Sequence, residues 1–221
     1  MRPRWLPRGA RTVPETPWRA HGSRWRARPS TAAVLLVGLW VFGTGEAALI
    51  EAGIGNSPWA VFAEGLGEQI GVSVGMAMFL TSVAILVAWV PLRERPGLGT
   101  IANAVVIALA IDVMIPVLPE PDALGLQVAM SLGGIVLVGI GSGLYLTCNL
   151  GPGPRDGLMT GLHFALDQPV AAVRFALEVM AVAAGWMLGG TVGLGTVLFA
   201  VLVGYAVSLG LAAAARFAAR R

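Results

Sequence analysis

Charged residues are scarce in this sequence of 221 residues: they make up 12% of it, and none of them is lysine. Globular chains carry about 25% charged residues. Hydrophobic residues account for 56% of the chain, and a water-soluble domain of this size has too little interior to bury them all. The composition therefore excludes an ordinary soluble domain.

Cysteine and histidine are also nearly absent. Cys148 is the single cysteine, so no disulfide can form within the chain, and two distant histidines (His21 and His163) with one cysteine do not make a zinc site. There is no P-loop, no dinucleotide-binding fingerprint and no His-Glu-x-x-His. The glycine-rich stretch at 139–143 lies in an apolar run with no strand before it, which favours close helix packing. We therefore expect no catalytic residue, cofactor, bound metal or nucleic-acid partner, and we expect that the protein is not an enzyme.

Long apolar runs are what the sequence does contain. Several runs of about 18 residues or more carry little or no charge, and this is the length at which an α-helix can cross a bilayer. The runs are apolar on every face. This pattern predicts an all-α membrane protein whose partner is the lipid bilayer.

The chain also repeats itself at a spacing of 96 residues. Without any gap, Gly55 matches Gly151, Pro58 matches Pro154, and Gly-Leu-Gly-Thr at 97–100 matches the same four residues at 193–196. Glycine and proline have positional meaning for the backbone, so these matches outweigh shared apolar composition. We infer an internal duplication.

Each half predicts the same order of elements: a long helix, a Gly/Pro break, a short helix and two further long helices. The long helices are expected over 32–52, 73–92 and 98–118, and over 128–148, 169–188 and 194–215. The backbone breaks fall at Gly55 and Pro58 and at Gly151, Gly153 and Pro154, and short helices follow over 58–70 and 154–166. A helix of about 13 residues is roughly 20 Å long, whereas the hydrocarbon core is about 30 Å thick. We therefore expect the short helices to be re-entrant or interfacial, which leaves six transmembrane helices.

Helix start signals support these boundaries. Ser57 can cap the first short helix with Pro58 at its first position, and Gly153-Pro154 has the same shape. Asp167, before Gln168-Pro169, is a similar start signal for the next long helix.

Arginine positions agree with six crossings. With the N-terminus inside, the loop at 93–95, Arg155 and the C-terminal arginines all lie on the cytoplasmic side, whereas the loops at 119–126 and 189–193 contain no arginine and lie outside. If the short helices crossed the membrane, the 93–95 loop would move outside. We therefore predict that both termini are cytoplasmic.

Because three crossings per half is an odd number, the second half is expected to be inserted upside down relative to the first. Two inverted repeats with discontinuous segments are typical of transporters and channels, whose sites lie at the repeat interface. The predicted parts are a disordered Arg/Pro-rich cytoplasmic tail over 1–30, repeat 1 over 31–118, an outer linker over 119–127, repeat 2 over 128–216 and a basic cytoplasmic C-terminus over 217–221.

Arg174 and Glu178 are four residues apart on the fifth expected crossing and share a helix face. A charge near mid-membrane costs roughly 2.5–3.5 kcal/mol on insertion scales, so such residues face a bundle interior and pair. The pair either lines a solute or ion path, or neutralises itself and locks helices together. The equivalent residues in the first half, Met78 and Ser82, are uncharged, which slightly favours a functional role.

The remaining charges in the apolar region also allow two interpretations. Arg155 and Asp156 open the second short helix and form either a gate or anion site, or a cap that holds the break rigid. Asp112, Glu46 and Glu51 are expected toward the outer side, where they form a cation or proton entrance or extend to the interface. The predicted polar lining of a transport path is Arg155, Asp156, Arg174, Glu178, Asp112 and Glu46.

At these motifs the chain resembles the bacterial YczE/YitT-type membrane proteins, most closely the YczE-like branch. The residues that carry the resemblance are LGPGPRDGLMTGL at 150–162, VRFALE at 173–178 and GWMLGGTVGLGTVLFAVLVG at 185–204. In the first half, GIGNSPWA at 53–60 is similar to the family's Gly-Leu-Gly-x-x-Pro-Trp-Asp, with Ala60 in place of the acid. The resemblance covers about residues 33–215 and implies a multi-pass protein of the bacterial inner membrane. It does not indicate a substrate.

Two functions fit these observations. The first is a small-solute transporter or channel-like permease with its site at the two Gly/Pro breaks. The second is a non-transporting membrane regulator or scaffold that acts through helix packing and the basic tail. The substrate, coupling ion, oligomeric state and protein partners do not follow from the sequence.

Overall fold

The computed structural model describes residues 13–219, and in this part of the chain every regular element is helical. The elements are α1 (Pro29–Glu51), α2 (Pro58–Ile70), α3 (Val74–Leu92), α4 (Leu98–Met114), the 3₁₀ turn η1 (Ile115–Val117), α5 (Leu124–Thr147), α6 (Pro154–Leu166), α7 (Val170–Met187) and α8 (Leu194–Ala219). The all-α prediction is therefore confirmed, with α5 starting four residues earlier than expected.

Six of these helices are long and apolar enough to cross a membrane: α1, α3, α4 with η1, α5, α7 and α8. Their outward faces carry large hydrophobic side chains at high exposure, such as Val87, Phe175 and Leu209. An apolar surface of this extent is stable only in lipid. The protein is thus a multi-pass membrane protein that resides in the bilayer.

The two short helices begin as their sequences predict. Ser57 accepts a hydrogen bond from the amide of Ala60, with Pro58 at the first helical position, and Gly153 precedes Pro154 in the same way without a side-chain bond. The expected start signal at Asp167 is wrong. That residue ends α6 in a left-handed conformation (φ 51°), and the cap position of α7 is Pro169 instead.

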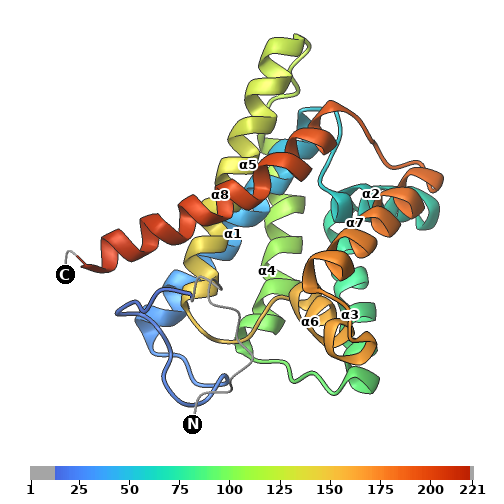
Figure 1. The fold of residues 1–221 in the computed structure, drawn as a ribbon. Coiled ribbons are helices and arrows are strands. Elements are labelled where there is room, and N and C mark those ends of the chain that lie inside the picture. The colour runs from blue at the N-terminus through green and yellow to red at the C-terminus, as the bar shows by residue number, and fades with distance from the viewer. Residues whose placement is uncertain (1–12, 220–221) are drawn as a thin grey trace.

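Helices α1 and α5 cross at the centre of the molecule (Figure 1). Glycines make the crossing close, because a Cβ on Gly45 would lie 2.6 Å from the carbonyl oxygen of Gly134, and one on Gly141 would lie 2.6 Å from that of Gly38. Helix α4 packs on α1 and α8 packs on α5. In the α5–α8 contact, a Cβ on Gly143 would lie 2.4 Å from the carbonyl oxygen of Gly210, so this glycine serves helix packing as expected.

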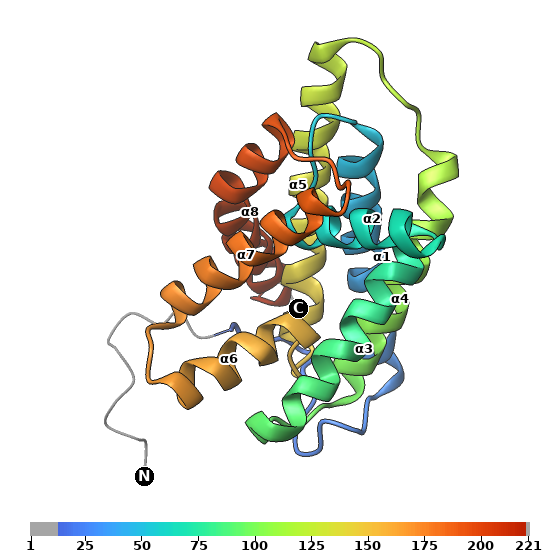
Figure 2. The same cartoon turned by 90° about the vertical axis from the view of Figure 1, so that its right-hand side faces the viewer.

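The short helices lie across the direction of the long ones, with α2 nearer the end of the molecule where α1 ends and α6 nearer the end where α5 ends (Figure 2). Helix α2 packs on α3 and α7, and α6 packs on α3 and α7. Trp89 of α3 fixes the start of α6, because its indole Nε1 donates to the Pro154 carbonyl at 3.0 Å.

Each Gly/Pro break is held by the Gly-Leu-Gly-Thr turn of the other half of the chain. The Gly195 amide donates to the Ile54 carbonyl at 2.8 Å, and the Gly99 amide donates to the Leu150 carbonyl, also at 2.8 Å. Gly55 and Gly151 adopt nearly the same left-handed φ, 113° and 111°, which favours glycine. These hydrogen bonds pair backbone N–H and C=O groups of the non-helical segments, which lipid could not do.

The segment 13–28 differs from the disordered tail expected there. It has no helix, but it packs against the end of α5: the Trp18 indole donates to Thr147 Oγ1 at 3.0 Å, and the Ala20 amide donates to the Cys148 carbonyl at 2.9 Å. Trp18 is buried and also contacts the ring of Phe217 in α8. An indole ring that is buried and hydrogen-bonded orders a segment whose composition alone predicts disorder. The rest of the predicted tail, residues 1–12, lies outside the described residues.

Candidate functional site

A cavity of about 380 Å³ lies between the two breaks. Its wall includes Ser57 and Pro58 from the first break, Pro152 and Gly153 from the second, and side chains from all six long helices. The volume falls within the range of about 300–1,000 Å³ found for small-molecule sites. Both breaks therefore open onto one shared space.

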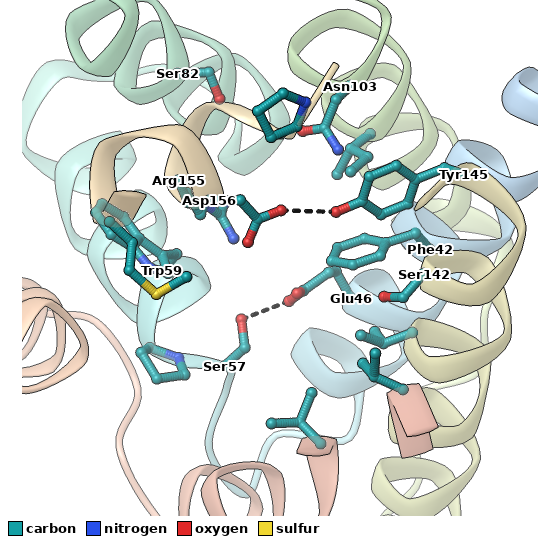
Figure 3. A pocket seen from close by; sticks show the side chains of 18 of the residues that line it. Phe42, Glu46, Ser57, Trp59, Ser82, Asn103, Ser142, Tyr145, Arg155 and Asp156 are labelled. Atoms are coloured by element: carbon teal, nitrogen blue, oxygen red, sulfur yellow. Dashed lines mark hydrogen bonds between the residues drawn. The ribbon is translucent and has the colours of Figure 1, made fainter. Parts of the chain in front are cut away.

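Glu46 is the most deeply placed acid in this cavity. Its side chain projects from α1, is 1% exposed, and accepts a hydrogen bond of 2.6 Å from the Ser57 hydroxyl (Figure 3). The same hydroxyl oxygen accepts from the Ala60 amide, so Ser57 links the carboxylate to the first turn of α2. A carboxylate out of water needs such donors or a counter-charge.

Arg155 and Asp156 enter the cavity from the first turn of α6 (Figure 3). Asp156 accepts a hydrogen bond of 2.9 Å from the Tyr145 hydroxyl, and its position near the helix N-terminus favours a negative charge. The guanidinium of Arg155 contacts the sulfur of Met78 and lies 5.2 Å from the ring centroid of Trp59, which is a cation–π arrangement. The pair therefore forms part of a solute-sized cavity and also fixes the start of α6.

Arg174 and Glu178 line the cavity from α7 and are paired with each other at 2.8 Å. Their side chains are 49% and 28% exposed, so they lie at its edge. The ion pair lies within α7, and its role, as the lining of a path or as a lock between helices, stays a prediction.

Asp112 lies outside this cavity, which corrects its place in the predicted lining. Its carboxylate accepts hydrogen bonds from the Ser73 hydroxyl (2.7 Å) and the Gly75 amide (2.8 Å) at the start of α3. It borders a second hollow, together with Glu64 and Glu68. Since Glu46 faces the central cavity and Asp112 does not, the acids expected at the outer side do not form one cluster.

Sequence reasoning missed Tyr145, which bonds Asp156, and did not foresee that Trp59 faces Arg155. It also missed Glu64. This carboxylate accepts from the Asn56 side chain (2.8 Å) and from the Thr191 amide (2.6 Å), and so ties the first break to the loop before α8. No sequence motif marks these residues, although the position of Trp59 directly after Pro58 was a usable signal.

Six helices long and apolar enough to cross a membrane, arranged around a cavity with charged residues and two broken segments in its wall, define a polytopic helical membrane protein. The chain belongs to a family of unknown function, DUF6198, whose model matches residues 30–210.

Relatives agree with this assignment. The chain is 42% identical to an uncharacterized protein of Haemophilus influenzae, over 93% of this chain and 94% of the relative. It is 34% identical to the uncharacterized membrane protein YczE of Bacillus subtilis, over 76% of this chain and 79% of the relative, which confirms the resemblance to the YczE-like branch. No solved structure matches the chain.

Proposed function

We propose that the protein is a small-solute transporter whose site is the central cavity, formed by two inverted repeats that face each other. The observation that carries the proposal is the cavity itself. It is solute-sized, it contains five charged side chains, and both broken segments contribute to its wall. This is where transporters of inverted-repeat architecture bind their substrates.

The lining residues support the two-repeat arrangement, because many of them are partners at the 96-residue spacing. Sixteen of the lining residues form eight such pairs. The pairs are Phe42 and Val138, Glu46 and Ser142, Ser57 and Gly153, Trp59 and Arg155, Met78 and Arg174, Ser82 and Glu178, Asn103 and Phe199, and Ile107 and Val203. A cavity on the axis that relates two equivalent halves would have this composition.

Contacts elsewhere exchange in the same way. Gly38 lies against Gly141, and their equivalents, Gly134 and Gly45, lie against each other. The hydrogen bond from Gly195 to Ile54 has its equivalent in the one from Gly99 to Leu150. Each contact between the halves therefore has an equivalent contact at the 96-residue spacing, as expected of two repeats related by a two-fold axis.

The two halves differ at one interface, and this difference supports a moving structure. Helix α3 packs on α4, but no comparable packing of α7 on α8 is present among the described residues. A Cβ on Gly75 would lie 2.3 Å from the carbonyl oxygen of Ala108, whereas Gly204, the equivalent of Ala108, has open space beside it. Two equivalent helix pairs are therefore packed together in one half and apart in the other. A transporter that exchanges two states requires such a pair of arrangements.

We infer that both termini face the cytoplasm. The segment 13–28 contacts Phe217, and the Leu98 amide donates to the Arg24 carbonyl, so these parts share one end of the molecule with the 93–97 loop. That end carries arginines at 24, 93, 95 and 216, whereas the loops at 52–57, 118–123 and 188–193 at the other end contain none. Arginine-rich loops stay on the cytoplasmic side.

A test that needs no known substrate uses Ser142→Cys in the cavity wall. A membrane-impermeant methanethiosulfonate reagent should label it from the outside in right-side-out cells and from the inside in inverted vesicles, because a transport cavity opens to both sides. The matched control on the same helix is Val136→Cys, which is 54% exposed on the lipid face and should resist the reagent. If Ser142→Cys is labelled from neither side, the cavity is sealed and the scaffold function is favoured.

A further inference from the structure

The charges that line the cavity do not balance. Its wall holds three carboxylates (Glu46, Asp156 and Glu178) and two guanidiniums (Arg155 and Arg174), which gives a net charge of minus one when all are ionised. Because Arg174 and Glu178 pair with each other at 2.8 Å, the imbalance lies among the other three. An uncompensated ion away from water is strongly unfavourable, so the cavity needs either a cation or a proton.

Glu46 is the carboxylate that most needs a bound cation or a proton. It is 1% exposed, and among the described residues its hydrogen-bond donor is the Ser57 hydroxyl. Asp156 is less buried, bonds Tyr145 and lies in the first turn of α6, whose N-terminus favours its negative charge, whereas the charge of Arg155 acts on both carboxylates. Of the two, Glu46 gains more from a bound cation or proton.

The walls suit an organic cation better than a metal ion. Phe42, Trp59 and Tyr145 surround the carboxylates in Figure 3, and aromatic faces attract cations. The Trp59 ring is already in a cation–π arrangement with the Arg155 guanidinium, so Phe42 and Tyr145 are the aromatic side chains left for a bound cation. Among the described residues, no group of three or more His, Cys, Asp or Glu could hold a metal.

We propose that the cavity binds one small monovalent organic cation, and that this cation and a proton on Glu46 are alternatives. The proposal rests on the transport function and makes it an exchange: the protonated Glu46 carboxyl releases its proton as the cation binds, and takes one up as the cation leaves. Each direction is balanced in charge, because one positive charge replaces another.

Few other titratable groups face Glu46. They are Tyr145 on α5, Arg155 and Asp156 on α6, and Arg174 and Glu178 on α7. The cavity-lining side chains of α2, α3, α4 and α8 are uncharged. Since Arg174 and Glu178 neutralise each other, the pH dependence of cation binding should come from Glu46.

The test uses the purified full-length protein and three probes of similar shape: choline, its uncharged isostere 3,3-dimethyl-1-butanol, and the anion 3,3-dimethylbutanoate. Choline should raise the thermal unfolding midpoint, and the other two should not. Its apparent affinity should rise by up to about tenfold per pH unit and then level off, because one proton is released for each cation bound.

Glu46→Gln should lower choline affinity at least about tenfold and abolish its pH dependence, since no proton is left to exchange. Glu68→Gln is the matched control, because Glu68 is exposed on α2 outside this cavity and should leave both properties unchanged. If Glu46→Gln does not fold, Ser57→Ala keeps the carboxylate but removes its hydroxyl donor. Choline binding by that variant should level off at a higher pH.

The outcomes separate this proposal from the transport function. If the anion or the neutral probe stabilises the protein and choline does not, the cavity is a solute site but the cation assignment is wrong. If choline binds with no pH dependence, the proton exchange is wrong. If no probe binds and Ser142→Cys is labelled from neither side, both proposals fail together.

Discussion

At the scale of single residues, Asp112 shows how a charge in an apolar helix can serve packing instead of a solute. Its two carboxylate oxygens accept from the Ser73 hydroxyl and the Gly75 amide, so a residue of α4 caps the start of α3. The first amides of a helix have no partner within the helix, and a negative group beside them is favourable. The carboxylate therefore joins two crossings of the same half.

Replacing Asp112 with Asn should lower the stability of the purified protein by about 1 kcal/mol, because the capping charge is lost while the shape is kept. Thermal unfolding in detergent measures this, with Asp122→Asn in the exposed loop before α5 as a control that should not change the midpoint. Choline binding should be the same in both variants. Loss of choline binding in Asp112→Asn without loss of stability would mean that Asp112 belongs to the solute site.

Cys148 should be unreactive in the folded protein. It is buried after the last turn of α5, and burial raises the pKa of its thiol to about 12. The reactive thiolate is therefore rare at neutral pH and becomes more common as the pH rises. A maleimide should label the wild type only after denaturation, whereas Asn149→Cys, an exposed neighbouring position, should be labelled at once. Rapid labelling of folded wild type would show that this end of α5 opens.

Sequence signals located the elements well and the contacts poorly, and both results have a physical reason. Ser57-Pro58 and Gly153-Pro154 mark helix starts through local backbone chemistry, so the two short helices were predicted at the residues where they occur. The contacts of Tyr145 and Asp112 depend on how each helix is rotated about its axis. A soluble helix shows that rotation by its apolar stripe, but the crossing helices here are apolar on every face and carry no stripe.

At the scale of helices, the main asymmetry is the closed α3–α4 pair against the open α7–α8 pair, which diverges from its connecting loop in Figure 1. The cavity reaches its edge at Arg174 and Glu178 on α7. If the halves exchange states, α7 must close on α8 while α3 separates from α4. Glycine and alanine at the equivalent positions permit close approach in both halves.

The closed state of the second half can be trapped by a disulfide. Ala171→Cys and Gly204→Cys occupy the positions equivalent to Gly75 and Ala108, which are in contact in the first half. Mild oxidation of membranes should therefore cross-link them, and choline should change the yield. The control pair, Ala171→Cys with Val197→Cys, joins opposite ends of α7 and α8 and should not cross-link. An absence of cross-linking in the first pair would mean that α7 and α8 stay apart.

At the scale of the whole molecule, the Gly-Leu-Gly-Thr turns at 97–100 and 193–196 link the two halves of the chain. Each Gly-Leu-Gly-Thr turn donates a backbone hydrogen bond to the break of the other half, so each broken segment depends on a turn from the other half of the chain. The six crossings then place one set of loops at the end with the N-terminal segment and the other set at the opposite end. The bilayer orientation that we propose rests on the arginines of the loops and terminal segments, which gather at the end with the N-terminal segment.

This orientation predicts opposite accessibility for two loop positions. Glu94→Cys, between α3 and α4, should react with an impermeant maleimide only in inverted vesicles, and Asp122→Cys, before α5, should react in intact cells. Because we expect buried Cys148 not to react, labelling of either introduced cysteine can be measured without removing the native one. If α2 and α6 crossed the bilayer, the 94 position would move to the outside and 122 to the inside. Because the result reverses, labelling of Glu94→Cys in intact cells would contradict both the cytoplasmic N-terminus and the short helices that turn back within the membrane.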